Sequence, residues 1–280
     1  MNLLKSLFIS ATSGFWMFLL LRALSGMIKQ PVSLANISLL LLSLVPLLFF
    51  GRLFMFKTPR TSKNLFLLTA GVTTGYVLAL IAFSNGLMSN TNIVLSTVSL
   101  ASWILYITWY SRFTKRNHEM LLPGNYLPEV SFLDEDGRKV TTSAFKDQKT
   151  IYLFYRGNWC PLCMAQIKEI SKQYQELADL GAEVVLVSSQ PHKNTKRLAR
   201  KMKVPFHFLT DKNNKAARKL GLDQKFAVPM GFQALGYDSE SVLPTVIITD
   251  EAGKIIYLDQ TDNYRVRPEP ATFIEIIKAA

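Results

Sequence analysis

The chain of 280 residues has room for two domains, and its net charge of +12 is unevenly distributed. Residues 1–122 contain ten Lys and Arg and one acidic residue, whereas residues 123–280 contain 22 Lys and Arg and 19 acidic residues. The positive charge thus belongs to the more hydrophobic half, which is typical of membrane topology. Basic and aromatic residues do not interleave in the second half, so we expect no nucleic-acid partner.

Four apolar stretches in the first half approach or reach the length of a membrane-spanning helix. They cover about residues 7–24, 32–50, 65–83 and 93–110. Pro46 lies inside the second stretch, Gly71 and Gly75 form a GxxxG pattern in the third, and Arg22 is the only charged residue in the four. The sequence predicts four transmembrane helices in contact with the lipid bilayer. The alternative for the first stretch is a signal peptide, although a clear A-x-A cleavage site is missing.

Aromatic residues in these stretches fit either interfacial belts or helix packing, which spacing does not decide. They are Trp16, Trp103, Tyr106, Trp109 and Tyr110. The stretches contain no cysteine, which thiol exchange requires, and no histidine, which is the usual haem ligand. We therefore expect the helices to serve as an anchor.

Basic residues are concentrated in two loops that flank these stretches. The second loop contains Arg52, Lys57, Arg60 and Lys63. After the fourth stretch come Arg112, Lys115 and Arg116. The loop 84–91 carries no charge, and Lys29 is the one exception to a cytoplasmic placement of the basic loops. We expect a multi-pass protein of the bacterial inner membrane whose second half faces the cytoplasm, where thiols are kept reduced.

The most informative stretch of the second half reads Y-L-F-Y-R-G-N-W-C-P-L-C-M over residues 152–164. An apolar strand ends in a polar turn, and Cys160 and Cys163 then fall in the first turn of an amphipathic helix with Pro161 at its first position. Helix amides and the helix dipole favour a thiolate at this place. The spacing of three also lets the two sulfur atoms meet, so the sequence predicts a thiol-redox site.

A metal site and a structural disulfide are the alternative roles for the cysteine pair, and both fit the sequence less well. A zinc site needs further ligands, but these are the only two cysteines, and His118, His192 and His207 lack paired-ligand spacing. We therefore expect no metal. A structural disulfide across so short a loop would add little stability.

The remaining elements of the second half alternate between strands and helices. The pattern predicts a hairpin over 130–141, strands at 151–155, 183–188 and 206–209, helices at 193–202 and 214–220, a second hairpin over 245–258 and a final helix over 270–280. Such an order gives a mixed α/β sheet covered on both faces. The predicted organisation is a membrane domain (1–112), a linker (113–129) and a redox domain (130–280).

From about residue 123 to 280, this half resembles the AhpC/TSA (peroxiredoxin-like redoxin) branch of the thioredoxin fold. The resemblance is carried by P-E-V-S-F-L-D-E-D-G-R-K-V-T-T-S-A-F, Y-R-G-N-W-C-P-L-C, V-P-F-H-F-L-T-D and L-P-T-V-I-I-T-D-E-A-G-K-I. It implies a thiol oxidoreductase that needs no cofactor. The first half resembles no family that we can name.

The resemblance points to two mechanisms. As a thioredoxin-like W-C-x-x-C, Trp159 precedes an attacking Cys160. Aligned on the peroxiredoxin pattern, Cys163 takes the peroxidatic position, Cys160 replaces the threonine and Arg156 replaces the proline. Because Cys160 lies nearest the helix start, we expect it to be open to solvent and to have the lower pKa.

Three features further along the chain bear on substrate binding. Leu243 and Pro244 stand where peroxiredoxins carry an arginine, and L-P-T resembles the cis-proline loop that lines the thioredoxin site. The apolar segment Phe226–Tyr237 forms either a wall of the site or part of the core. His207 lies in a strand pattern and is expected in the core.

The leading hypothesis is a membrane-anchored thiol-disulfide oxidoreductase that reduces protein disulfides with the Cys160/Cys163 dithiol. A rival is a hydroperoxide reductase in which Cys163 attacks and Cys160 resolves. Either enzyme requires a thioredoxin-type or glutathione-type electron donor. A rival of another class is a redox sensor without turnover.

Overall fold

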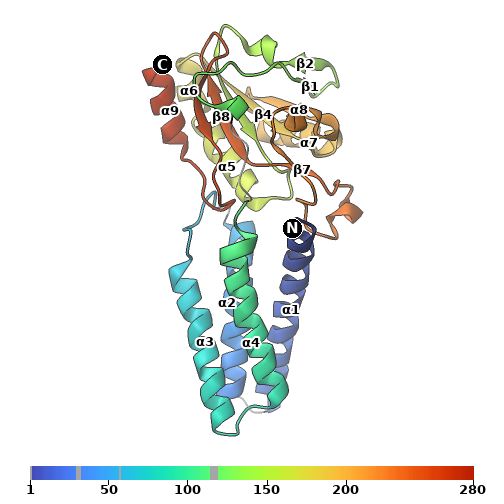
Figure 1. Cartoon of the computed structure of the whole chain (residues 1–280), viewed down its shortest axis with the longest axis vertical. Helices are drawn as coiled ribbons and strands as arrows, with labels where there is room; N and C mark the ends of the chain where they lie inside the picture. Colours follow the sequence, from blue (N-terminus) through green and yellow to red (C-terminus); the bar gives the residue numbers. More distant parts are fainter. Residues whose placement is uncertain (1, 30–32, 57, 114–118) are drawn as a thin grey trace. The chain divides into compact units, whose positions relative to one another are not determined.

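The computed structural model describes residues 2–29, 33–56, 58–113 and 119–280 of the chain (Figure 1). Lys57, Lys115 and Arg116 of the basic loops, and His118, lie outside these ranges. The chain divides into a helical unit and a second unit, here called the redox unit. The helical unit comprises Leu7–Lys57 and Thr61–Arg112, and the redox unit comprises Met1–Ser6, Thr58–Arg60 and Phe113–Ala280.

Four long apolar helices form the first half of the chain, as the hydropathy pattern predicts. They are α1 (Asn2–Lys29), α2 (Leu34–Met55), α3 (Phe66–Ser84) and α4 (Asn90–Leu105), and α4 continues into a π-helical turn, Tyr106–Tyr110. Each of the four helices is long and apolar enough to cross a membrane, when the π-helical turn is counted as part of α4. The helices extend beyond most of the predicted bounds, because residues that flank the apolar stretches continue the helical backbone.

Aromatic side chains pack between the helices. Trp16, Trp103 and Tyr106 are fully buried, and the Trp103 and Tyr106 rings stack with their centroids 5.7 Å apart. Phe49 meets both of these rings edge-on at 5.8 Å. Of the two arrangements left open by the sequence, helix packing therefore applies to these three residues.

The redox unit is built on a seven-stranded sheet with the order β2-β1-β5-β4-β3-β8-β9. Its strands are β1 (Ser131–Leu133), β2 (Lys139–Thr141), β3 (Lys149–Phe154), β4 (Ala182–Ser188), β5 (His207–Thr210), β8 (Thr245–Thr249) and β9 (Ile255–Asp259). Its helices are α5 (Pro161–Ser171), α6 (Tyr174–Asp179), α7 (His192–Met202), α8 (Lys215–Lys219) and α9 (Pro270–Ala279). All the predicted strands and helices of this half are present.

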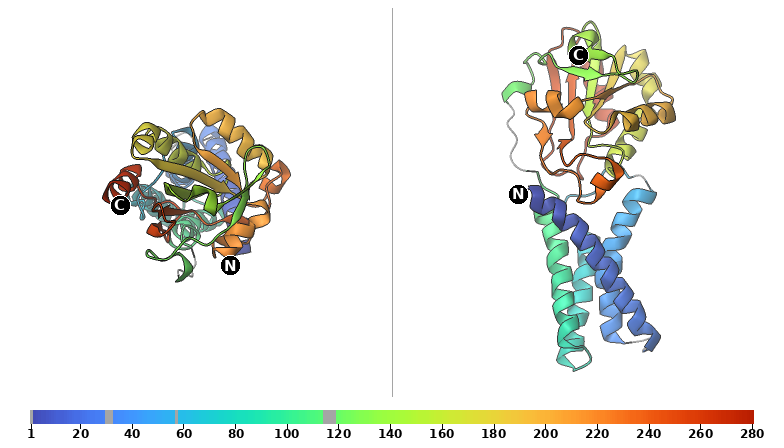
Figure 2. Two further views of the ribbon diagram at one scale, coloured as in Figure 1. Left: turned by 90° about the horizontal axis from the view of Figure 1, so that it is seen from above. Right: turned by 90° about the vertical axis from the view of Figure 1, so that its right-hand side faces the viewer.

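The centre of the sheet is parallel and its edges are antiparallel. β3 pairs in parallel with β4, and β4 with β5, whereas both predicted hairpins, β1–β2 and β8–β9, are antiparallel. Right-handed crossovers from β3 to β4 and from β4 to β5 place α5, α6 and α7 on one face. Figure 2 shows helices beside the sheet in two further views.

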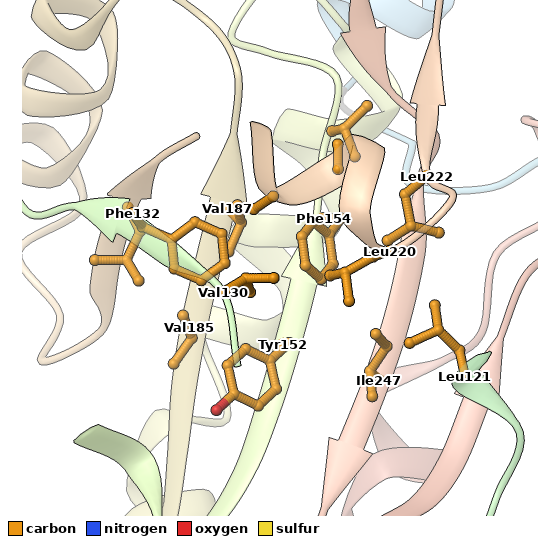
Figure 3. Close-up of a cluster of buried hydrophobic side chains, with 14 of the residues drawn as sticks. Leu121, Val130, Phe132, Tyr152, Phe154, Val185, Val187, Leu220, Leu222 and Ile247 are labelled. Carbon is orange, nitrogen blue, oxygen red and sulfur yellow. The ribbon is translucent and has the colours of Figure 1, made fainter. Parts of the chain in front are cut away.

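The other face of the sheet carries a continuous apolar core that includes α8. In register across neighbouring strands, Tyr152 lies opposite Val185 and Phe154 opposite Val187. These four side chains pack with Leu220, which directly follows α8, and are at most 2% exposed (Figure 3). The alternate residues of β3 and β4, whose side chains point to the opposite face of the sheet, are equally buried. Both faces of the sheet are therefore covered.

Three details differ from the sequence expectations. The cysteine helix is interrupted between α5 and α6. The irregular segment after α8 contains a two-stranded sheet of β6 (Asp223–Gln224) and β7 (Ser241–Val242). The core assignment of His207 is wrong: its side chain is 44% exposed and pairs with Glu183 at 2.9 Å, because it is the first residue of β5 and only the three that follow are buried.

The glycines of the third helix make a close contact with the second. A Cβ atom added to Gly75 would lie 3.0 Å from Leu41 Cβ, whereas a Cβ atom on Gly14 of α1 would meet nothing within 4 Å. We predict that Gly75→Val lowers the stability of the helical unit by about 1–3 kcal/mol through overpacking. Gly14→Val is the matched control and should not.

The measurement is SDS titration of the detergent-solubilised chain, followed by circular dichroism at 222 nm. Equal midpoints for the two variants would contradict the close contact between α2 and α3.

Candidate thiol-redox site

The two cysteines lie where a central strand passes into a helix. β3 ends at Phe154, a turn follows, and Cys160 is the N-cap of α5 with Pro161 at its first position. The Cys160 sulfur accepts a hydrogen bond from the Cys163 backbone N–H at 3.4 Å. This bond satisfies one of the free amides of the helix start, so the thiol acts as a capping group.

The two sulfur atoms are in contact but not bonded. Both cysteines are free thiols, and their Sγ atoms are 2.7 Å apart. Cys160 is 2% exposed and Cys163 is not exposed at all. A disulfide can therefore form with a small displacement of two side chains.

The two thiols differ in pKa because their surroundings differ. Burial raises the pKa of Cys163, but the hydrogen bond from Cys160, the charge of Arg267, and the backbone N–H and charge of Arg156 together lower it to about 5. Burial and the hydrogen bond to Cys163 raise the pKa of Cys160 well above its usual range. These contacts favour the thiolate at Cys163 and the protonated thiol at Cys160.

This difference overturns the expectation that Cys160 is open to solvent and has the lower pKa. The helix-terminus argument considered only the position of each cysteine along α5. It left out the burial of the N-cap residue and the charges that other segments bring to the deeper sulfur.

Arg267 is a site residue that the sequence did not predict. Its Nη2 lies 3.5 Å from Cys163 Sγ, and its Nη1 donates to Gln166 Oε1 at 2.8 Å. The side chain is 6% exposed and also interacts with the charge of Asp259. Arg267 thus reaches the thiols from the segment that follows β9. The only signal in the sequence was the pair Arg265 and Arg267, which resembles ordinary surface charge.

Arg156 and Trp159 form the turn beside the thiols. The Arg156 guanidinium carbon lies 4.5 Å from the centre of the Trp159 ring, and its Nη2 donates to the Ala227 carbonyl. Gly157 adopts a φ of +140°, and an added Cβ would lie 2.9 Å from the Trp159 ring. This position therefore requires glycine.

A buried glutamine fixes the same turn and was not predicted. Gln190 accepts from the backbone N–H of Asn158 at 2.8 Å and donates to the Tyr155 hydroxyl at 3.0 Å. It is 4% exposed. Its position directly after β4 gives no indication of this role, because the contact spans 32 residues of sequence.

The apolar segment Phe226–Tyr237 is brought to this turn. The Phe232 ring lies 5.7 Å from that of Trp159, whereas Met230 and Leu235 are 48% and 63% exposed. The segment is therefore neither wholly core nor wholly surface. It contacts the turn through the Phe232 ring and through the Ala227 carbonyl, which accepts from Arg156.

The cis-proline expectation for Pro244 is wrong. The peptide bond between Leu243 and Pro244 is trans, as is every peptide bond among the described residues. Leu243 N–H donates to the Leu222 carbonyl at 2.7 Å, and the chain then enters β8 directly, so the more stable trans isomer fits. Pro244, together with Gln166 and Arg267, lines a small, open pocket.

Strand order and site together define a thioredoxin-fold domain with a dithiol at the start of the helix after a central parallel strand. Residues 123–258 match the model of the AhpC/TSA family. This match confirms the resemblance predicted from the sequence: the segment is similar to the AhpC/TSA family.

Relatives of the segment are peroxiredoxins. Peroxiredoxin Q of Sedum lineare is 32% identical over 99 residues, which are 35% of this chain and 53% of that protein. Peroxiredoxin Q of Triticum aestivum is 29% identical over 121 residues, which are 43% of this chain and 56% of that protein. Both are described as chloroplastic. The chain thus spans about half the length of these relatives.

Among solved structures, Enterococcus faecalis AhpC is similar with a TM-score of 0.47 and 20% identity, covering 57% of this chain and 92% of that one. Peroxidoxin BcpB from Mycobacterium tuberculosis also gives 0.47, with 16% identity, 56% of this chain and 96% of that one. The fold assignment rests on the strand topology and the family match.

The charge of Arg267 yields a direct prediction. Arg267→Gln should raise the pKa of Cys163 by about 1–3 units, because the closest cation is lost. The thiolate is measured by its absorbance at 240 nm against pH, in the detergent-solubilised Cys160→Ser chain where Cys163 is the only thiol. Arg138→Gln is the control, since Arg138 pairs with Asp136 at the exposed β1–β2 turn. An unchanged titration in Arg267→Gln would contradict the assigned role of this arginine.

Proposed function

We propose that the chain is a membrane-anchored, thiol-dependent hydroperoxide reductase in which Cys163 attacks and Cys160 resolves. The observation that carries the proposal is a buried Cys163 with its pKa lowered to about 5, beside Arg267 and in contact with the Cys160 thiol. Full burial limits access to small groups. A hydroperoxide needs to present only its O–O bond, whereas a protein disulfide must bring a chain to the sulfur.

The chemistry follows from the two protonation states. The Cys163 thiolate attacks one peroxide oxygen: an S–O bond forms, the O–O bond breaks, and the alkoxide leaves and takes up a proton as the alcohol. The Arg267 charge stabilises the negative charge that moves onto the leaving oxygen. The Cys160 thiol then loses its proton and attacks the sulfenic sulfur, which forms the disulfide and releases water.

Regeneration requires an external dithiol of the thioredoxin type or two thiols of the glutathione type, which are oxidised to a disulfide as the Cys160–Cys163 disulfide is reduced. Cys160 is the better point of attack for two reasons. Of the two buried cysteines, only Cys160 has any exposed surface, 2% of the residue, and attack there expels Cys163, whose lower pKa makes it the better leaving group. No bound cofactor is needed for this cycle.

The contact between the two sulfur atoms also favours a second function, reduction of protein disulfides by the same dithiol. It ranks lower because the attacking sulfur would have to be uncovered first. A redox sensor without turnover would form the same disulfide once. Repeated peroxide consumption with a dithiol donor distinguishes an enzyme from this sensor.

The membrane placement is supported by the helical unit itself. Large apolar side chains point away from the helix contacts: Phe66 is 78% exposed, Leu67 82% and Val94 60%. Arg22, the one charge in the predicted spans, donates to Asn92 Oδ1 at 2.7 Å, which partly satisfies it. We place the four helices in the bacterial inner membrane, with the redox unit in the cytoplasm on the charge asymmetry of the loops.

The first test concerns which cysteine reacts with peroxide. In the detergent-solubilised chain, Cys160→Ser should consume one equivalent of hydroperoxide and retain a sulfenic acid on Cys163 that dimedone traps. Cys163→Ser should consume none, because the remaining thiol has a raised pKa. Dimedone labelling of Cys160 in Cys163→Ser, with none in Cys160→Ser, would refute the assignment.

The second test concerns topology. In a chain with both cysteines replaced by serine, we place single cysteines at exposed sites by Lys139→Cys in the redox unit and Asn85→Cys in the uncharged loop. A membrane-impermeant maleimide should label the second variant in intact cells and the first only after permeabilisation. The reverse pattern would place the redox unit outside the cytoplasm.

A further inference from the structure

Arg60 is an arginine of the α2–α3 connector that belongs to the redox unit. The segment Thr58–Arg60 groups with this unit, although the residues on both sides of it group with the helices. Its side chain is 25% exposed. From the sequence, Arg60 has only a topological role, as one of several cytoplasmic positive charges.

One guanidinium makes contacts with two parts of the thiol site. Nη1 and Nη2 of Arg60 donate to the two carboxylate oxygens of Glu169 in α5, at 3.1 and 2.5 Å. Nε donates to the Arg267 carbonyl and Nη2 to the Pro268 carbonyl, both at 3.2 Å. Glu269, the N-cap of α9, adds a second carboxylate at 3.6 Å.

These contacts attach the chain that carries Arg267 to the helix that carries Cys163. Along α5, Gln166 holds the Arg267 side chain directly, and Glu169, three residues later on the same face, holds its backbone through Arg60. An arginine suits this place because its planar fork supplies five donors, whereas a lysine has a single nitrogen. The pair is partly buried, so solvent screens it less than an exposed ion pair.

We propose that Arg60 is a positioning residue of the thiol site: it holds the segment 267–269 against α5 and thereby keeps the Arg267 guanidinium beside Cys163. The proposal rests on the same Cys163 thiolate as the proposed function, but it does not depend on what the thiolate reacts with. It makes the α2–α3 connector a component of the site.

The test measures the thiolate-to-thiol ratio of Cys163 by absorbance at 240 nm, in the full chain in detergent with Cys160→Ser. Arg60→Gln should lower this ratio about tenfold at a given pH near 5, which corresponds to a rise of about one pKa unit. Glu169→Gln removes the same ion pair from the other side and should act in the same direction. Arg138→Gln is the control for loss of a positive charge elsewhere.

Two further variants separate positioning from charge. Arg60→Lys keeps the charge but loses the fork, so it should resemble Arg60→Gln; a ratio equal to that of the parent chain would overturn the proposal. If Arg60 acts through Arg267, Arg60→Gln should change nothing further in the Arg267→Gln chain. An undiminished second effect would overturn it as well.

Circular dichroism confirms that each variant is folded before it is titrated, and Glu169→Gln replaces Arg60→Gln if the latter does not fold. No hydroperoxide is present in these titrations. Failure of the peroxidase function would therefore leave their outcome unchanged, and an unchanged Cys163 ratio in both Arg60→Gln and Glu169→Gln would refute the positioning role alone.

Discussion

A buried thiolate is the constraint on which the redox unit depends. Removing an anion from water is costly unless charges and hydrogen-bond donors replace the solvent. The unit surrounds Cys163 with the Cys160 thiol, the Arg156 backbone N–H and the Arg267 guanidinium. These groups come from the helix start, the turn before it and a segment 104 residues further along the chain. The fold is therefore needed to create the reactive sulfur, because no local stretch of sequence contains all of its partners.

Cys160 illustrates how one substitution serves several purposes. It stands where the peroxiredoxin pattern has a threonine, and a thiol there retains the ability to cap α5 and to donate to the neighbouring sulfur. It adds a second redox-active sulfur in contact with the first. The raised pKa that makes Cys160 a poor nucleophile keeps it as the protonated donor that stabilises the Cys163 thiolate. The same contact between the sulfur atoms thus contributes to the difference in pKa and holds the two atoms in position to form a disulfide.

Periodicity and turn residues predicted nearly all of the architecture, since the elements are determined locally. The apolar runs of β3 and β4, the polar turns of both hairpins and Pro161 at the start of α5 each have a physical meaning within a few residues. The site was less predictable. The dithiol was evident from its spacing, but the order of the two pKa values was wrong, because it depends on burial and on Arg267. The trans bond at Pro244 likewise depends on how the chain enters β8, which a tripeptide does not reveal.

The sequence suggested that the helices only anchor the redox domain, since they lack cysteine and histidine. That argument concerns side chains that take part in the reaction, but not side chains that hold other residues in position. Arg60 lies between two of these helices in sequence, and its contacts reach the backbone of Arg267 and a carboxylate of the cysteine helix. An arginine that supplies geometry is indistinguishable, in sequence, from one that supplies topological charge. If the segment 267–269 depends on this contact, the residues from 113 to 280 without Arg60 retain both cysteines but lose part of what keeps one of them ionised.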